Sequence, residues 1–221
     1  MKWRIEKGGI SFIGGGGLLF LIMGGIYLSH PTPPFLIITA LSLFLVFFMV
    51  FFFRDPLRTI KEREGEILAP ADGQIVEIEE VFEEEFLKEK VKKVAIFLHL
   101  FDPHINRSPV EGEVKWVCYR RGKFHPAFLK KASKENERNS IGIETPSYKV
   151  LVKQIAGTIA RRVVSYVEEG QILKKGEKIG LIRFGSRVEL FLPEDVQLRV
   201  RKGDRVKAGI TVIGEIRFNS K

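Results

Sequence analysis

The sequence predicts a mainly β protein that carries a transmembrane α-helical hairpin at its N-terminus. Two long apolar segments without charged side chains, residues 8–28 and 35–53, predict the hairpin. From about residue 65 onward the chain consists of short β-branched runs separated by glycines, which is typical of a compact β sandwich or barrel. One segment, residues 125–139, predicts a single short helix within this β-rich part.

The two apolar segments have the length and composition of membrane spans. Residues 35–53, FLIITALSLFLVFFMVFFF, are long enough to cross the ~30 Å hydrocarbon layer as a helix. Residues 8–28 contain glycines that weaken a helix but allow two membrane helices to pack closely. The alternative is a cleaved signal peptide, which is disfavoured because a second full-length span follows at once. We therefore expect a two-span membrane anchor in residues 1–54.

Basic side chains flank the predicted hairpin on both outer sides, whereas the connection SHPTPP contains neither lysine nor arginine. The positive-inside rule then places both termini in the cytoplasm, with residues 55–64 as a basic linker at the cell membrane. The net charge of +9 fits an anionic membrane surface. No recognisable nucleic-acid-binding motif accompanies it, so we expect no nucleic-acid partner. The flanking residues are Lys2, Arg4, Lys7, Arg54, Arg58, Lys61 and Arg63.

Residues 65–221 contain an internal repeat. Gly170 and Gly176 recur at the same spacing as Gly203 and Gly209, and each pair encloses a polar, apolar and basic stretch before a strand. Such paired hairpins are typical of a barrel sandwich that resembles biotinyl and lipoyl domains. A symmetric β scaffold is favoured over a carrier function, because no lysine stands at a recognisable hairpin tip.

Neither the cysteine nor the potential metal ligands of the sequence predict a functional site. Cys118 is the single cysteine, which excludes an internal disulfide, and it fits a small core residue. No cluster of histidine, cysteine and acidic residues has metal-ligand spacing, so no metal is predicted.

The pair Gly185-Ser186 lies within the strand-like stretch IGLIRFGSRVELFLP, residues 179–193. It could be a plain β-bulge. It could also be a bond that the chain cuts, because a serine hydroxyl can attack the preceding carbonyl and convert the amide to an ester. Glycine before the serine suits this chemistry, since no side chain blocks the approach of the hydroxyl.

The stretch KGEKIGLIRFGSRVELFLP resembles the self-cleavage segment of phosphatidylserine decarboxylase proenzymes of the short class. The resemblance extends over nearly all of the β-rich part, in blocks that follow the order of the family. These blocks are APADG at 69–73, FDPHINRSPVEG at 101–112, GKFHPAF at 122–128, NERN at 136–139 and QIAGTIARR at 154–162.

This resemblance implies a pyruvoyl-dependent carboxy-lyase. Cleavage between Gly185 and Ser186 would give a β chain of residues 1–185 and an α chain of residues 186–221, with Ser186 converted to an N-terminal pyruvoyl group. That group would form a Schiff base with the headgroup amine of a phosphatidylserine-type lipid and release carbon dioxide. The product would be phosphatidylethanolamine or its archaetidyl equivalent. Homo-oligomer formation is left open by the sequence.

Two further residues match family positions. Asp72 matches the acidic residue of the Asp-His-Ser processing triad, although an Asp-Gly pair is also a common turn signal. His104 matches a family histidine, and an imidazole suits proton transfer to a substrate carbanion. Longer family members carry a second histidine where this chain has Arg107. The processing base is therefore either His104 or another group.

Arginines are the candidates for binding the lipid phosphate or the substrate carboxylate, since a guanidinium group binds both. A solvated basic face is the alternative for each of them. The competing functional class is a non-enzymatic, membrane-anchored adaptor with a barrel-sandwich domain. That class usually has a long helical hairpin between its two half-motifs, and the chain is too short for one there. The candidate arginines are Arg107, Arg161, Arg162 and Arg187.

Overall fold

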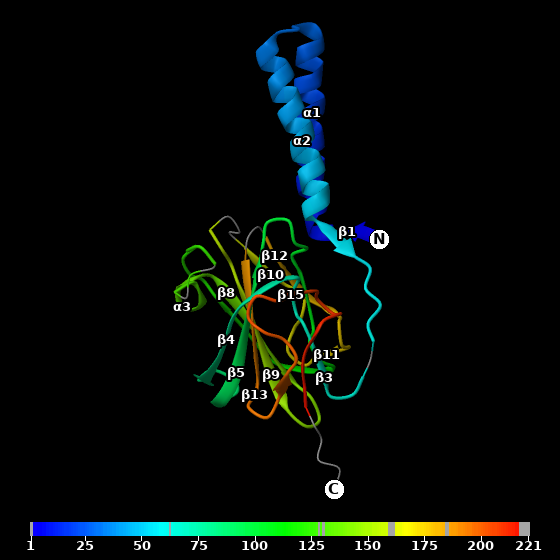
Figure 1. Cartoon of the computed structure of the whole chain (residues 1–221). Helices are drawn as coiled ribbons and strands as arrows, with labels where there is room; N and C mark the ends of the chain where they lie inside the picture. Colours follow the sequence, from blue (N-terminus) through cyan, green and yellow to red (C-terminus); the bar gives the residue numbers. More distant parts are fainter. Residues whose placement is uncertain are drawn as a thin grey trace. The chain divides into compact units, whose positions relative to one another are not determined.

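The computed structural model of the protein describes residues 2–61, 63–127, 129, 131–158, 162–183 and 186–216. The chain divides into two compact units, Met1–Leu57 and Arg58–Lys221, and each is described by itself. Figure 1 shows the first as a helical unit and the second as a β-rich unit. The mainly β prediction with an N-terminal helical pair is confirmed.

The first unit contains two antiparallel helices with the length and hydropathy of membrane spans, α1 (Ile10–Ser29) and α2 (Pro33–Phe52). Prolines open α2, where a missing N–H costs no helical hydrogen bond. A Cβ atom at Gly16 of α1 would lie 3.3 Å from Val46 of α2, so the glycine permits close packing of the helices.

The basic flanks of this helical pair form two paired strands, which the sequence did not indicate. Strand β1 (Trp3–Ile5) pairs with β2 (Arg54–Pro56) in antiparallel register, so Arg4 lies opposite Asp55. A short 3-10 helix, η1 (Lys7–Gly9), connects β1 to α1. The chain therefore enters and leaves the helical pair at the same end.

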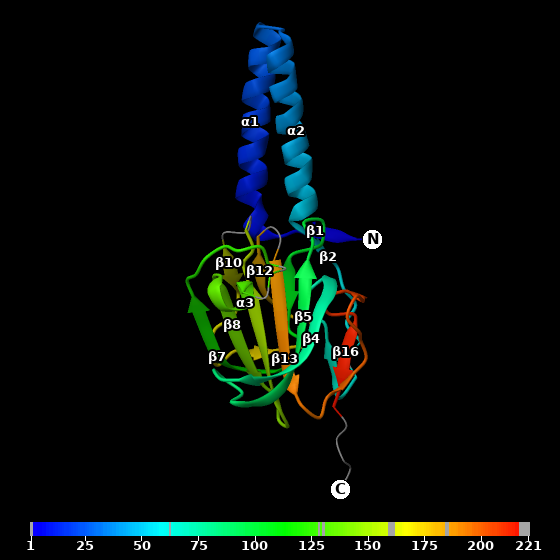
Figure 2. The same cartoon turned by 60° about the vertical axis from the view of Figure 1, so that its left-hand side comes forward.

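The second unit is built on one curled sheet of eight strands and two sheets of three (Figures 1 and 2). The large sheet has the order β11-β7-β8-β9-β13-β5-β4-β15, and the small sheets are β10-β12-β6 and β14-β16-β3. The strands are β3 (Glu66–Leu68), β4 (Gly73–Glu83), β5 (Glu89–Leu98), β6 (Ile105–Arg107), β7 (Gly112–Arg120), β8 (Arg138–Glu144), β9 (Lys149–Ile155), β10 (Val163–Ser165), β11 (Ile172–Leu173), β12 (Lys178–Ile182), β13 (Ser186–Pro193), β14 (Gln197–Leu198), β15 (Arg205–Val206) and β16 (Val212–Glu215).

The repeat seen in the sequence is a structural repeat. Its four glycines all have positive φ, as tight turns require. The turns precede β11 and β12 in one copy and β15 and β16 in the other, and β11 and β15 form the two opposite edges of the large sheet. Matching hydrogen bonds hold both copies: Gly176 N donates to Ser108 O at 2.8 Å, and Gly209 N to Ala69 O at 2.9 Å. The unit therefore has two similar halves that meet at the β9-β13 pair.

The interior face of the large sheet carries the apolar core. Along β13 the alternate residues Val188, Leu190 and Leu192 are fully buried in this core, next to Ile96 of β5. Strand alternation directs the intervening residues to the opposite face. The two faces of β13 therefore have different surroundings.

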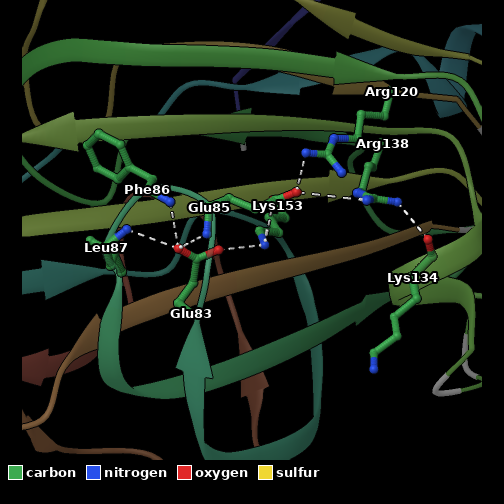
Figure 3. Close-up of polar contacts among 8 residues, drawn as sticks. All are labelled: Glu83, Glu85, Phe86, Leu87, Arg120, Lys134, Arg138 and Lys153. Atoms are coloured by element: carbon green, nitrogen blue, oxygen red, sulfur yellow. Dashed lines mark hydrogen bonds and ion pairs between the residues drawn. The ribbon is translucent and has the colours of Figure 1, made fainter.

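Charged side chains pack on the opposite face, against the turn between β4 and β5. One carboxylate oxygen of Glu83 accepts from the backbone N–H groups of residues 85–87 at 2.8–3.1 Å (Figure 3). Lys153 of β9 bridges Glu83 at 2.8 Å and Glu85 at 2.9 Å. Arg120 adds a contact to Glu85 at 2.7 Å. These contacts bind the turn to the sheet.

The predicted short helix is present, but it is shorter than residues 125–139. Helix α3 comprises Ala132–Glu135, and residues from Arg138 onward belong to β8. The side chain of Asn136 accepts from His125 N and donates to Ala156 O. These contacts with distant backbone end the helix before Asn136. Tertiary contacts therefore override the local helical pattern.

Candidate active site

Ser186 is the first residue of β13, where it lies opposite Leu98, the last residue of β5. Strand alternation directs its side chain to the interior face, together with Val188. Ser186 is fully buried, and its Oγ atom has no hydrogen-bond partner among the residues that the structure describes. Gly185, the other half of the predicted cleavage bond, lies outside the described residues.

Asp72 reaches the same end of β5 from the other side. It immediately precedes β4, which flanks β5 opposite β13, with Gln74 beside Phe97. The Asp72 carboxylate lies 2.6 Å from Arg58 Nη2 and accepts from Ala208 N at 3.3 Å. Burial raises the pKa of Asp72, and the Asp102 charge adds to this rise, which the Arg58 guanidinium only partly offsets.

His104 lies beside the strand that leads toward Ser186. It directly precedes β6, and its carbonyl accepts from the N–H of Ile182, the last residue of β12, at 3.2 Å. Its imidazole is buried, with Nδ1 2.7 Å from the carbonyl oxygen of Asp102. Because a carbonyl only accepts, Nδ1 carries the proton of the neutral ring and Nε2 has the lone pair that can accept one.

Asp102 and Arg205 complete this end of the sheet, and the sequence reasoning did not select them. Asp102 accepts from His99 N at 2.9 Å and from Arg205 Nη2 at 2.6 Å. Arg205 lies in β15, whose Val206 pairs with Gly73. Asp102 therefore ties the loop of His104 to the strands beside Asp72. Its position in the block FDPHINRSPVEG was the available signal.

The predicted arginines do not gather at one place. Arg107 is half-buried and donates to Gly176 O at 3.1 Å, and Arg162 is exposed. Arg187 is only 1% exposed and lies on the face of β13 opposite Ser186. Its guanidinium contacts Glu189 at 2.8 Å and Glu77 at 3.3 Å, which favours a structural role over lipid binding. Arg161 lies outside the described residues.

The structure thus places Ser186 and Asp72 at the end of the large sheet where β5 finishes, and His104 beside the last residue of β12 in a three-stranded sheet. Within the described ranges, no group of three or more histidine, cysteine or acidic side chains could hold a metal ion. The arrangement joins a buried hydroxyl, an imidazole with an acceptor nitrogen and a carboxyl of raised pKa. Such groups are suited to nucleophilic attack and proton transfer.

Comparison with known proteins decides the family. The sequence model described as Phosphatidylserine decarboxylase matches residues 45–214, which include all the predicted site residues. The chain belongs to the phosphatidylserine decarboxylase family. The sequence blocks on which the resemblance rested therefore lie in a chain of this family, and the resemblance is confirmed.

Individual members of the family match over most of their length. The chain is 56% identical to a phosphatidylserine decarboxylase proenzyme of Carboxydothermus hydrogenoformans, over 80% of this chain and 84% of the relative. It is 42% identical to the proenzyme of Syntrophus aciditrophicus, over 92% and 97% of the two chains. A third such proenzyme, from Cytophaga hutchinsonii, is 43% identical over 89% and 91%.

Proposed function

We propose that this chain is the precursor of a membrane-anchored phosphatidylserine decarboxylase that cuts itself between Gly185 and Ser186. Family membership supports the activity. The observation that carries the site is the buried Ser186 hydroxyl, which has no hydrogen-bond partner within the described part of the chain. A buried hydroxyl left unpaired is costly in a folded protein, so its retention favours a role in chemistry.

Self-cleavage follows from the chemistry of Ser186. Its Oγ attacks the preceding carbonyl carbon, the C–N bond breaks, and the released nitrogen takes the hydroxyl proton, which leaves an ester. A base then removes the α-proton of residue 186 and the ester C–O bond breaks. Residue 185 keeps a carboxylate, and hydrolysis of the resulting dehydroalanine releases ammonia and leaves a pyruvoyl group on the fragment 186–221.

The surroundings of residue 186 fit such a group. Its side chain is buried on an apolar interior face beside Leu98 and Val188. The pyruvoyl carbonyl supplies an electron sink for the decarboxylation of an amino acid headgroup. The chain's own residues hold the substrate and move protons around it.

His104 is our candidate for the base and proton donor, because its Nδ1 donates to Asp102 O, which puts the lone pair of the neutral ring on Nε2. Asp72 is the second processing residue. Burial raises the pKa of its carboxyl toward neutral pH, where the group can both take up and release a proton. Arg107, Arg161 and Arg162 are candidates for the lipid phosphate. Arg187 is the weakest candidate, because two carboxylates already face its guanidinium.

Residues 1–54 would anchor the enzyme in the cell membrane, with 55–64 as a linker and 65–221 as the catalytic domain. The pairing of β1 with β2 supports this topology, because it puts both basic flanks at the same end of the helical pair. The β-rich domain would then lie on the cytoplasmic side, where it meets a phosphatidylserine-type lipid. The fragments 1–185 and 186–221 would stay together, since β13 pairs with both β5 and β9.

Intact-mass spectrometry of the purified full chain tests the proposal, with Ser186→Ala as the control. We expect wild type to give fragments 1–185 and 186–221, the latter beginning with pyruvoyl, and the control to stay intact. The mature protein should release carbon dioxide from phosphatidylserine in mixed micelles. An uncut wild-type chain would overturn the proposal and favour the adaptor class.

A second measurement separates the two roles of His104. In His104→Gln, loss of cleavage would identify the imidazole as the processing base. Normal cleavage with loss of carbon dioxide release would restrict it to the decarboxylation. Wild-type rates in both assays would exclude His104 from the chemistry.

A further inference from the structure

Three buried amide side chains form a head-to-tail relay across the interior of the β-rich unit. Asn139 Nδ2 donates to Gln154 Oε1 at 3.0 Å, and Gln154 Nε2 donates to Asn106 Oδ1 at 2.8 Å. All three residues are at most 1% exposed. The relay ends on Asn106 Nδ2, a buried N–H donor that has no hydrogen-bond partner in the described part of the chain.

The relay joins the strands on the two sides of the cleavage bond. Asn106 in β6 lies opposite Gly180 of β12, the strand that precedes the bond. Gln154 in β9 lies opposite Val188 of β13, the strand that follows it. The hydrogen bond from Gln154 to Asn106 therefore links β9 with β6, the strands that pair with these two.

The middle residue of the relay, Gln154, lies close to Ser186. Because Gln154 faces Val188, it is a diagonal cross-strand neighbour of Ser186 on the same face, at a Cα separation of roughly 7–8 Å. Asn106 is one hydrogen bond beyond Gln154, and it lies two residues after His104 on the same strand side. Among the residues that the structure describes, the unpaired donor of Asn106 and the unpaired hydroxyl of Ser186 therefore both belong to neighbours of Gln154, one through a hydrogen bond and one across the strand pair.

The chain leaves room for this arrangement at Gly180. A Cβ atom there would lie 2.5 Å from Gln154 Nε2 and 2.5 Å from the carbonyl oxygen of Val164. Any larger residue would push Gln154 away from Asn106. The close approach of β12 to the relay therefore depends on glycine at this position.

We propose that Asn106 supplies a hydrogen bond to the negative charge that develops during self-cleavage, and that Gln154 and Asn139 are positioning residues that aim it. This inference rests on the proposed function. When the Ser186 hydroxyl attacks, the new C–O bond pushes the carbonyl π electrons onto oxygen, and the charge returns as the C–N bond breaks. A fixed amide donor stabilises that oxygen. The uniform direction of the relay polarises the terminal N–H and strengthens it.

The test compares Asn106→Leu with Asn139→Leu, two substitutions of nearly equal size. Each removes one hydrogen bond to Gln154, but only Asn106→Leu removes the terminal donor. Full-length precursor is made by cell-free synthesis with nanodiscs, and the appearance of fragment 186–221 is followed over time. We expect self-cleavage to slow about 100-fold in Asn106→Leu and to change by less than about fivefold in Asn139→Leu. Melting temperatures of both variants, measured on a Ser186→Ala background, report their effects on the fold.

Equal slowing in the two variants, or a wild-type rate in Asn106→Leu, would overturn the inference. If Asn106→Leu fails to fold, the pair Asn106→Ser and Asn106→Ala replaces it, because these differ by one hydroxyl donor. Faster cleavage in the serine variant supports the inference, and equal rates overturn it. A wild-type chain that never cleaves would instead refute the proposed function, and that result is distinguishable because it does not depend on the relay.

Discussion

The carboxylate of Asp72 lies 2.6 Å from the guanidinium of Arg58, and both side chains are almost completely buried. The pKa of Asp72 is nevertheless raised, because the effect of burial is larger than the attraction of Arg58. Arg58 therefore offsets part of the free-energy cost of burying the Asp72 carboxylate at the candidate site.

Replacing Arg58 by alanine should destabilise the β-rich unit and raise the pKa of Asp72 further. Removing one partner of a buried ion pair costs about 3–5 kcal/mol, because the other charge is left uncompensated. Denaturant unfolding of the full chain in detergent, on a Ser186→Ala background, measures this loss. Arg63→Ala is the control, since Arg63 is exposed and its contact with Glu66 is 3.6 Å long. Equal losses in both variants would contradict the role assigned to Arg58.

Substitution of Glu83 by glutamine should weaken the turn between β4 and β5. The buried Glu83 carboxylate accepts from three backbone N–H groups and from Lys153, and a glutamine cannot satisfy all of these donors. We expect a loss of about 3 kcal/mol in the free energy of unfolding. Hydrogen exchange of residues 84–88 should also accelerate. The adjacent exposed Glu84→Gln should change neither quantity, and an equal effect there would refute the assignment.

Acid should destabilise the protein through Glu77. Burial alone would raise the pKa of Glu77, but Lys93 and Arg187 hold it at about 2 against an ordinary value of 4.5. A carboxyl with a lowered pKa stabilises the fold above its ordinary pKa, and this contribution is lost as pH falls from 4.5 through about 2. The decline in unfolding free energy across this range should be smaller in Glu77→Gln than in wild type. The exposed Glu80→Gln serves as the control, and an unchanged decline in Glu77→Gln would count against the ion pairs.

Gly180→Ala should disturb the amide relay without touching its side chains. The new methyl group would lie 2.5 Å from Gln154 Nε2, so overpacking should cost about 1–3 kcal/mol and self-cleavage should slow. Gly170→Ala is the comparison, since it meets no atom within 4 Å and only strains a positive φ. We expect Gly170→Ala to lower the melting temperature and leave cleavage unchanged. Normal cleavage in Gly180→Ala would show that the relay tolerates displacement.

The sequence predicted features that depend on local properties of the chain. The two apolar segments became helices because their composition alone fits that structure. The repeated glycines became turns because positive φ is a property of a single residue. The helix at residues 125–139 was overestimated, because hydrogen bonds from Asn136 to distant backbone end it at Glu135.

The candidate site was predicted only where a motif names the residue. Ser186, Asp72 and His104 were selected from family blocks, and strand pairing places Ser186 and Asp72 on the two sides of the end of β5. Arg58 was read as part of a basic flank, and the relay of Asn106, Gln154 and Asn139 was missed. These residues act through partners that no short stretch of sequence contains.

Adjacent residues of β13 show which properties the sequence predicts and which depend on the tertiary structure. The sequence by itself determined the family, the apolar spans and the turn glycines, and it selected Ser186 for the proposed cleavage bond. It could not decide that Ser186 faces the core while Arg187 faces Glu77 and Glu189. Strand alternation separates neighbours in sequence onto opposite faces, and the pairing register then selects their partners from strands far along the chain. Burial in the folded sheet sets the ion pairs, the raised pKa of Asp72 and the Asn106 donor that has no partner among the described residues.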